Sequence, residues 1–176
     1  MKMSTLPLLL VAMMALTRAA VLPDTEAGNG AETGGEMDVF KRTYHSECPW
    51  GWSKYGQRCF HFVPREMTWS DALTNCWSMG ANLASVHDAG EYHWIQKLIA
   101  DRSHAHPLAY IGGTDMLHEG HWRWTDGSPF LFSYWCHGEP NNAGWQHCLQ
   151  MNYTGNKCWA DVWCHFPRAS VCAKKI

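Results

Sequence analysis

The sequence of 176 residues lacks several features that define large functional classes. After residue 20 it has no apolar run long enough to cross a bilayer, so membrane insertion is not expected. Lysine and arginine form no stripe and the formal net charge is −2, so nucleic acid is not an expected partner. The chain also has no glycine-rich phosphate loop and no nucleophile elbow, so we do not expect an enzyme.

The first 47 residues contain neither cysteine nor tryptophan and divide into two segments. Residues 1–19 place Lys2 before the apolar run 6–16 and end in small residues, which predicts a signal peptide and secretion. Residues 20–47 hold six acids and several glycines without hydrophobic periodicity, which is typical of a disordered segment. A dibasic pair ending at Arg42 is either a processing site for a pro-segment or an ordinary solvated pair.

The remaining residues, 48–176, are rich in cysteine and tryptophan. All eleven tryptophans lie after residue 49, which predicts core packing for most of them. In an oxidising compartment an even number of cysteines predicts disulfides, here four, but the count leaves many pairings open. The eight are Cys48, Cys59, Cys76, Cys136, Cys148, Cys158, Cys164 and Cys172.

Local patterns in 48–176 predict one small α+β domain. Thr68 precedes a helix expected over 69–79, and Asp88 with Glu91 starts a second helix with an apolar stripe. The stretch 125–147 is rich in Gly, Pro, Asn and aromatic residues, so it is a long irregular loop and the expected place for a site. Short strands are predicted at 59–63, 108–111, 122–124, 148–153, 158–162 and 170–173.

Motifs spread over this whole region carry a family resemblance. They include CPWGW at 48–52, ANLASV at 81–86, YIGG at 110–113, WTDG at 124–127, EPN at 139–141, CWAD at 158–161 and VCA at 171–173. Their order and spacing resemble the C-type lectin-like domain, over about residues 48–175. Within that family the chain is most similar to small secreted fish lectins and type II antifreeze proteins. The resemblance implies a single domain in which two helices flank small antiparallel sheets, with a long irregular loop region.

The resemblance also implies how the cysteines pair. Members of the antifreeze type carry a further pair, at the positions where this chain has Met116 and His147. The implied disulfides are Cys48–Cys59, Cys76–Cys172, Cys148–Cys164 and Cys136–Cys158, the last matching an extra bridge of the antifreeze members.

A calcium site is the main functional implication of the resemblance. Calcium prefers six to eight oxygen ligands and tolerates loop geometry. Gln146 stands where a glutamate is usual and Ala160 where an asparagine is usual, so calcium binding is expected to be weaker than in an intact site. An alternative is that the matching residues are plain turn residues. The implied metal ligands are Glu139, Asn141, Gln146 and Asp161.

The sugar site implied by the family shares this loop. The triplet Glu139-Pro140-Asn141 resembles the mannose-type form of the loop, and the implied sugar contacts are Glu139, Asn141, Trp145 and Asp161. Trp135 and Trp163 also flank the region, either as packing residues or as stacking surfaces.

The sequence also contains residues typical of two other kinds of site. The histidine pairs His104/His106 and His118/His121 suggest zinc, but His118-Glu-Gly-His121 lacks the i, i+4 spacing of a helical zinc motif and lies among turn residues, so zinc is not expected. Asn152 lies in the only glycosylation sequon, and strand alternation predicts that its side chain points away from the core.

The sequence therefore supports a secreted carbohydrate-binding lectin of the innate-defence kind, calcium-dependent and mannose-type. Its alternative is a type II antifreeze protein that contacts ice with the same surface, and a third hypothesis is a lectin-like fold used only for protein contacts. The Glu-Pro-Asn loop favours the lectin, whereas the Cys136/Cys158 pair and the incomplete calcium shell favour antifreeze. The sequence does not indicate an oligomeric state.

Overall fold

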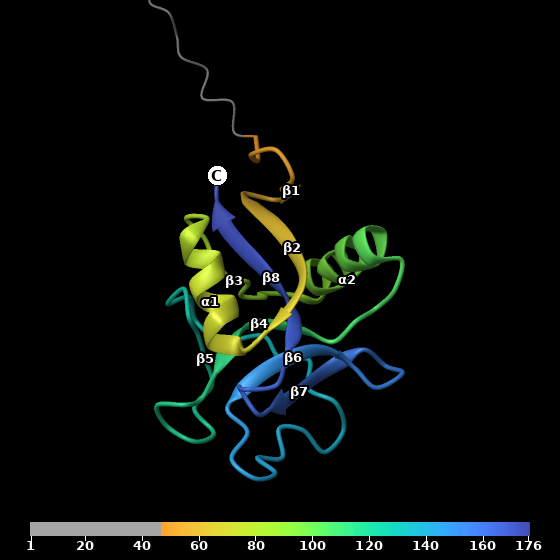
Figure 1. Cartoon of the computed structure of the whole chain (residues 1–176). Helices are drawn as coiled ribbons and strands as arrows, with labels where there is room; N and C mark the ends of the chain where they lie inside the picture. The colour runs from red at the N-terminus through yellow and green to blue at the C-terminus, as the bar shows by residue number, and fades with distance from the viewer. Residues whose placement is uncertain (1–46) are drawn as a thin grey trace, which may run out of the picture. The chain divides into compact units, whose positions relative to one another are not determined.

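A computed structural model describes residues 47–176 (Figure 1). The predicted signal peptide, almost all of the acidic segment and the dibasic pair at Arg42 lie outside the described residues. In the part that is described, no helix has the length and apolar character needed to cross a membrane. The elements are β1 Ser53–Tyr55, β2 Arg58–Met67, α1 Trp69–Ser78, β3 Asn82–Leu83, α2 Ala89–Ser103, β4 Ala109–Thr114, β5 Arg123–Trp124, β6 Cys148–Tyr153, β7 Cys158–Val162 and β8 Arg168–Lys175.

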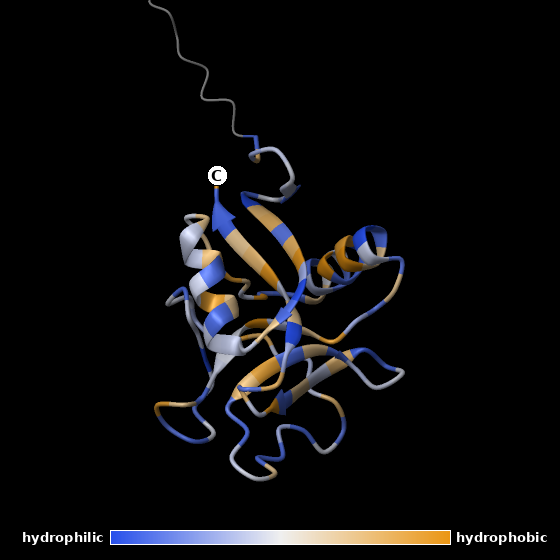
Figure 2. Cartoon of the chain, viewed as in Figure 1, coloured by the Kyte–Doolittle hydropathy of each residue, from blue (hydrophilic) through white to orange (hydrophobic). Residues whose placement is uncertain are grey.

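Both helices begin at the predicted caps. The Thr68 side chain accepts a hydrogen bond from the backbone N–H of Asp71 at 3.2 Å, and Asp88 accepts one from that of Glu91 at 2.8 Å. These bonds satisfy backbone donors that a helix leaves unpaired at its first turn. In Figure 2 the apolar part of α2 lies toward β2. The predicted stripe of α2 is buried: Tyr92, Ile95, Leu98 and Ile99.

The strands join in one mixed sheet in the order β1-β2-β8-β4-β6-β7, with β3 on β8 and β5 on β4. The expectation was small antiparallel sheets. All strand pairs are antiparallel except β4 with β8, where Ala109 pairs with Ala169 in parallel. This contact joins strands β1, β2 and β8 to strands β4, β6 and β7 in a single sheet. Figure 1 shows α1 and α2 on either side of the β2/β8 pair, as the resemblance implied.

All eight cysteines form the implied disulfides. Cys76–Cys172 ties α1 to β8 across 96 residues of sequence. Cys136–Cys158 ties the long irregular loop to β7. The two bridges therefore restrain a helix and the long loop against the sheet.

Trp159 of β7 is the centre of the core beneath the long loop. It is fully buried, and its ring meets five other rings edge-on. Three of the five come from residues 130–135, so aromatic packing holds that part of the loop on β7. The five partners are Tyr92, Trp124, Phe130, Phe132 and Trp135.

Candidate functional site

The predicted site lies on the last part of the long loop, next to β7. The Cys136–Cys158 disulfide and an isolated β-bridge between Trp135 and Trp159 fix the loop just before it. Cys148, the first residue of β6, fixes it at the other end through its bond to Cys164. We call residues 137–147, between these anchors, the site segment.

Asp161 of β7 anchors the backbone of the site segment. Its side chain is 3% exposed. Oδ1 accepts a hydrogen bond from the backbone N–H of Asn141 at 3.0 Å, and Oδ2 accepts one from Asn142 at 2.6 Å. Hydrogen bonds to a charged acceptor contribute about 1.5–3 kcal/mol each, more than neutral ones. The buried carboxylate thus fixes the chain directly after Pro140.

Glu139 and Asn141 form a paired acceptor and donor around the Glu139–Pro140 peptide bond, which is cis. Asn141 Nδ2 donates to Glu139 Oε1 at 2.8 Å, and Asn141 Oδ1 accepts from the backbone N–H of Ala143 at 2.8 Å. Burial and then the adjacent Asp161 carboxylate raise the pKa of Glu139 to about 7. The structure therefore brings Glu139, Asn141 and Asp161 together in one network.

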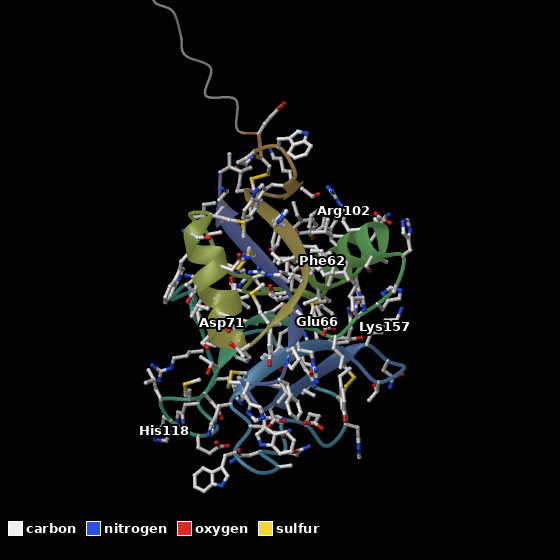
Figure 3. The ribbon with its side chains drawn as sticks, viewed as in Figure 1. Phe62, Glu66, Asp71, Arg102, His118 and Lys157 are labelled. Carbon is white, nitrogen blue, oxygen red and sulfur yellow. A yellow bond between two sulfur atoms is a disulfide. The ribbon has the colours of Figure 1, made fainter. Side chains whose placement is uncertain are left out.

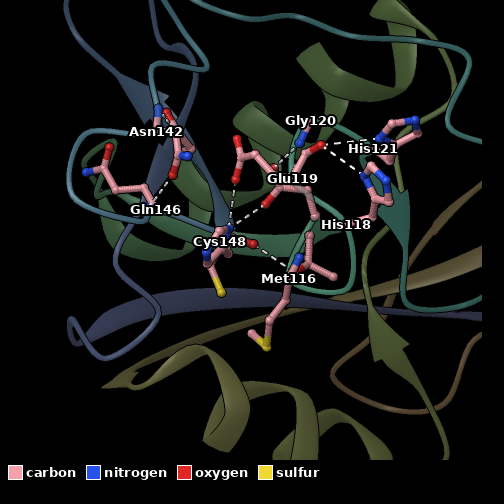
Figure 4. Close-up of polar contacts among 12 residues, drawn as sticks. Met116, His118, Glu119, Gly120, His121, Asn142, Gln146 and Cys148 are labelled. Carbon is pink, nitrogen blue, oxygen red and sulfur yellow. Dashed lines mark hydrogen bonds and ion pairs between the residues drawn. The ribbon is translucent and has the colours of Figure 1, made fainter.

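Gln146, the fourth predicted ligand, lies at the other end of the site segment. Its backbone N–H donates to the side-chain oxygen of Asn142 at 3.0 Å (Figure 4). Within residues 47–176, no hydrogen-bond donor reaches the buried Gln146 Oε1 or Glu139 Oε2. An unpaired buried acceptor costs about 1–3 kcal/mol, and a cation would supply the missing interaction.

The donor set of the site segment fits a hard cation. The available groups are carboxylate and amide oxygens, which calcium prefers. Ala160, 1% exposed on β7, contributes no side-chain oxygen. The residues present therefore fit calcium with fewer side-chain ligands than the family pattern, and the ligand set stays a prediction.

The three tryptophans near the site have different environments. Trp135 packs edge-on against Trp159, with ring centroids 5.8 Å apart. Trp163 donates its indole N–H to the carbonyl oxygen of Gly144 at 2.5 Å and so supports the site segment. Trp145 is 80% exposed, whereas Trp135 and Trp163 are partly buried, so Trp145 is the most accessible of the three rings.

A second cluster of ionisable side chains, not found from the sequence, includes His147 at the end of the site segment. His147 Nδ1 lies 3.0 Å from Asp115 Oδ1 and 3.3 Å from Glu119 Oε2. Asp115 and His147 are 32 positions apart, and the pairing of Thr114 with Cys148 across β4 and β6 brings them together. A local pattern cannot reveal such a register. The signal that could have suggested the cluster is the disulfide that antifreeze members carry at the positions of Met116 and His147, because it implies that the two loops meet.

The histidine pairs considered from the sequence lie elsewhere. His118 and His121 meet edge-on, with ring centroids 3.9 Å apart, and each Nδ1 lies 3.2 Å from the carbonyl oxygen of Glu119. His104 caps the end of α2 in a left-handed conformation, with φ of 55°.

The prediction that Asn152 points away from the core was wrong. Its side chain is 5% exposed, and its Nδ2 donates to the carbonyl oxygen of Pro107 at 2.9 Å. The reason is a register shift in β6 between Gln150 and Tyr153, where Asn152 itself has a left-handed φ of 63°. Such an irregularity breaks the two-residue alternation of a strand. In the folded domain the amide nitrogen of this sequon is therefore not accessible.

Comparison with known proteins gives consistent results. The family profile of the Lectin C-type domain matches residues 65–174. The type-2 ice-structuring protein of Brachyopsis segaliensis is 39% identical over 98% of both chains. Ladderlectin of Oncorhynchus mykiss is 38% identical over 93% of this chain and 89% of its own. The solved structure titled Ca2+-dependent type II antifreeze protein (Ca2+-free form) is 34% identical, with a TM-score of 0.69 over 73% of this chain and 100% of that one.

Proposed function

The chain belongs to the C-type lectin domain family, as its motifs predicted, and from that premise we propose that it is a secreted, calcium-dependent lectin for a mannose-type sugar. The ligands for calcium are Glu139, Asn141, Gln146 and Asp161. Secretion is supported by the signal-peptide pattern of residues 1–19 and by four disulfides, which persist in oxidising compartments.

One observation carries this proposal: two buried oxygens of the site segment, Glu139 Oε2 and Gln146 Oε1, have no donor among residues 47–176. The carboxylate of Asp161 lies beside Glu139 and adds negative charge. A divalent cation would satisfy both oxygens and neutralise the carboxylate pair. When bound, calcium would also supply open coordination positions for sugar hydroxyls.

The protein's own groups can bind a sugar in a specific way. Asn141 Nδ2 donates to Glu139 Oε1 at 2.8 Å, so a donor and an acceptor lie side by side. A sugar hydroxyl group both donates and accepts hydrogen bonds. It can therefore accept from Asn141 in place of Glu139 and donate to Glu139 in place of Asn141. The exposed ring of Trp145 offers an apolar face for the carbon side of a sugar. Because Ala160 supplies no amide, we expect an affinity about ten- to a hundredfold lower than with a complete set.

Ice binding is the second candidate, because exposed apolar side chains lie on the site segment and on the neighbouring loop after β4. Met116 and Leu117 are exposed on the loop after β4, and Trp145 is exposed on the site segment. The His147 contacts to Asp115 and Glu119 join these loops. Relatives named as ice-structuring proteins match nearly the whole chain. Protein contacts alone remain the third hypothesis.

The test is a glycan array in calcium and in EGTA, run beside a thermal-hysteresis assay on the same preparation. The lectin proposal predicts calcium-dependent retention of mannose-type glycans, lost in Glu139→Gln and kept in Glu66→Gln. Glu66 is an exposed glutamate on β2 (Figure 3) and serves as the matched control. Thermal hysteresis without glycan binding would support the antifreeze candidate instead. Absence of both activities would leave protein contacts.

A further inference from the structure

We propose that a cavity far from the site segment is a second binding site, which takes an acidic sugar residue by its carboxylate or sulfate group. The cavity has a volume of about 610 Å³, and ligand pockets typically measure about 300–1,000 Å³. Figure 1 shows the end of β8, marked C, at the opposite end of the domain from β7 and its loops. We call it the basic cavity, because three of its lining side chains are cationic: Arg58, Lys174 and Lys175.

Segments that are distant in the sequence meet at the basic cavity and hold its shape. They are the start of β2, the turn after α1, the turn after β5 and the end of β8. Asn82 of β3 pairs with Ala173 of β8, and both residues line the cavity. The Cys76–Cys172 disulfide fixes β8 directly before Ala173. The cavity is therefore formed before a ligand arrives, which lowers the cost of binding.

Two of the three cations face each other across the sheet. Arg58 of β2 lies directly opposite Lys175 of β8 in the antiparallel register. Such partners place their side chains on the same face of the sheet, and like charges in this arrangement destabilise the pair. An anion bound between the two side chains would remove the repulsion.

The carboxylates near the basic cavity are already bound by donors of the protein. Glu91 accepts hydrogen bonds from Arg58 at 2.7 Å and from a backbone N–H at 2.9 Å. Asp126 Oδ1 accepts from the N–H and the hydroxyl of Ser128, at 2.9 and 2.5 Å. Asp126 Oδ2 accepts from the hydroxyl of Ser85 at 2.5 Å. These carboxylates are therefore engaged within the protein and do not neutralise the lysines.

The lysines, by contrast, have no carboxylate partner within residues 47–176. Lys174 Nζ donates to the carbonyl oxygen of Met79 at 3.2 Å and lies 4.2 Å from the centre of the Trp52 ring. Neither contact supplies a negative charge. Lys175 is exposed near the end of β8. The cavity therefore offers positive charge to a ligand.

Arg58 is positioned by its own hydrogen bonds and still has donors to give. Its guanidinium donates to the carbonyl oxygen of Ser85 at 3.1 Å, to the Ser85 hydroxyl at 2.9 Å and to Glu91. A guanidinium carries five N–H donors, so two have no partner among the described residues. Charge-assisted hydrogen bonds from such donors are among the strong ones in proteins.

The rest of the lining favours a hydroxylated anion over a fatty or aromatic acid. The described residues that line the cavity include no phenylalanine, tryptophan or tyrosine and no branched aliphatic side chain. Asn82, His87 and Ser128 offer hydrogen-bonding groups, and Ala81 and Pro129 offer small apolar surfaces. A sugar acid combines hydroxyl groups, C–H faces and one anionic group, so it matches all three parts of the lining.

The experiment is an NMR titration of the ¹⁵N-labelled full chain in EGTA, which keeps calcium from the site segment. Glucuronic acid tests the carboxylate and N-acetylglucosamine 6-sulfate tests the sulfate. At least one should bind and shift the amide signals of Ala81, Gly127 and Ala173. Lys175→Gln should weaken this binding by about tenfold or more, because a charged hydrogen bond is lost.

The matched control is Lys97→Gln, which removes the same charge from an exposed position on α2 and should leave binding unchanged. Lys175 is exposed, so its variant should fold, and its melting temperature checks this. Glu139→Gln should also bind the sugar acid like the parent, because it alters only the site segment. Binding that persists in Glu139→Gln supports the basic cavity whether or not the protein is a mannose-type lectin.

Four results would overturn the proposal. The first is no binding of either sugar acid, and the second is equal weakening in Lys175→Gln and Lys97→Gln. The third is binding that Lys175→Gln leaves intact and Glu139→Gln abolishes, which would place the sugar acid at the site segment. The fourth is inorganic sulfate that binds as tightly as the better of the two sugars, which would show a site for a free anion only.

Discussion

Oδ2 of Asp161 lies 2.6 Å from the backbone nitrogen of Asn142, and this hydrogen bond joins the sheet to the segment that carries the proposed ligands. Burial and then the same carboxylate raise the pKa of Glu139, so one buried side chain holds the backbone and also influences the charge of the site. Stability and ligand binding are therefore expected to change together when Asp161 is altered.

Asp161→Asn tests this coupling. One carboxylate oxygen becomes an NH₂ group that faces a backbone N–H, so a charged hydrogen bond is lost. We expect the free energy of unfolding to fall by about 1.5–3 kcal/mol and calcium binding to disappear. Urea unfolding and calcium calorimetry measure the two effects. Asp101→Asn is the control, because it breaks only an exposed pair with Lys97 and should cost less than about 0.5 kcal/mol. Equal losses in both variants would contradict the anchoring role.

Gly144→Ala tests the support from Trp163. Gly144 has a φ of 71°, and a Cβ there would lie 3.0 Å from Trp163 Cζ2. The left-handed conformation alone costs a non-glycine residue about 1–2 kcal/mol. We expect a lower melting temperature and weaker ligand binding. Gly155→Ala, where a Cβ meets nothing within 4 Å, should be close to neutral. A neutral Gly144→Ala would show that Trp163 does not hold the site segment.

Local chemistry made much of the fold predictable. Thr68 and Asp88 start their helices because each side chain reaches a backbone N–H three residues ahead. The disulfides and the positions of Glu139, Asn141 and Asp161 followed from a family whose motifs are strung along the whole chain. Their contacts in the structure agree with that grouping.

What could not be predicted depends on strand register. The left-handed φ of Asn152 turns its side chain inward, and alternation carries no information about such a residue. His147 meets Asp115 only because Thr114 pairs with Cys148. The separation of 32 residues hides this contact from any local pattern, and the only indication of it is the pair that antifreeze members carry at the positions of Met116 and His147.

The raised pKa of Glu139 predicts a pH dependence of stability without calcium. The ordinary pKa is 4.5, and burial with the Asp161 carboxylate raises the pKa to about 7 in the folded protein. Between these values the folded state binds more protons than the unfolded state, so this carboxyl lowers stability as pH rises. Relative to the parent in EGTA, Glu139→Gln should gain stability across that window and show no further change above it. Urea unfolding at a series of pH values measures the difference, and a difference independent of pH would refute the carboxylate contact.

Restoring the two departures from the family pattern tests the calcium site most directly. Gln146→Glu replaces an oxygen that lacks a donor by a carboxylate and adds a third negative charge, so calcium affinity should rise by roughly tenfold. Adding Ala160→Asn supplies an amide that a sugar hydroxyl can accept from, so mannose affinity should rise further. Because Ala160 is 1% exposed, the larger side chain should also cost about 1–3 kcal/mol of stability.

Calcium calorimetry and mannose binding are compared with the parent and with Gln57→Glu, a change at an exposed turn. If the parent already binds calcium as tightly as the double variant, Gln146 and Ala160 are not ligand positions. If neither protein binds calcium, the oxygens of Glu139 and Asp161 do not surround a metal, and the ice-binding candidate is favoured.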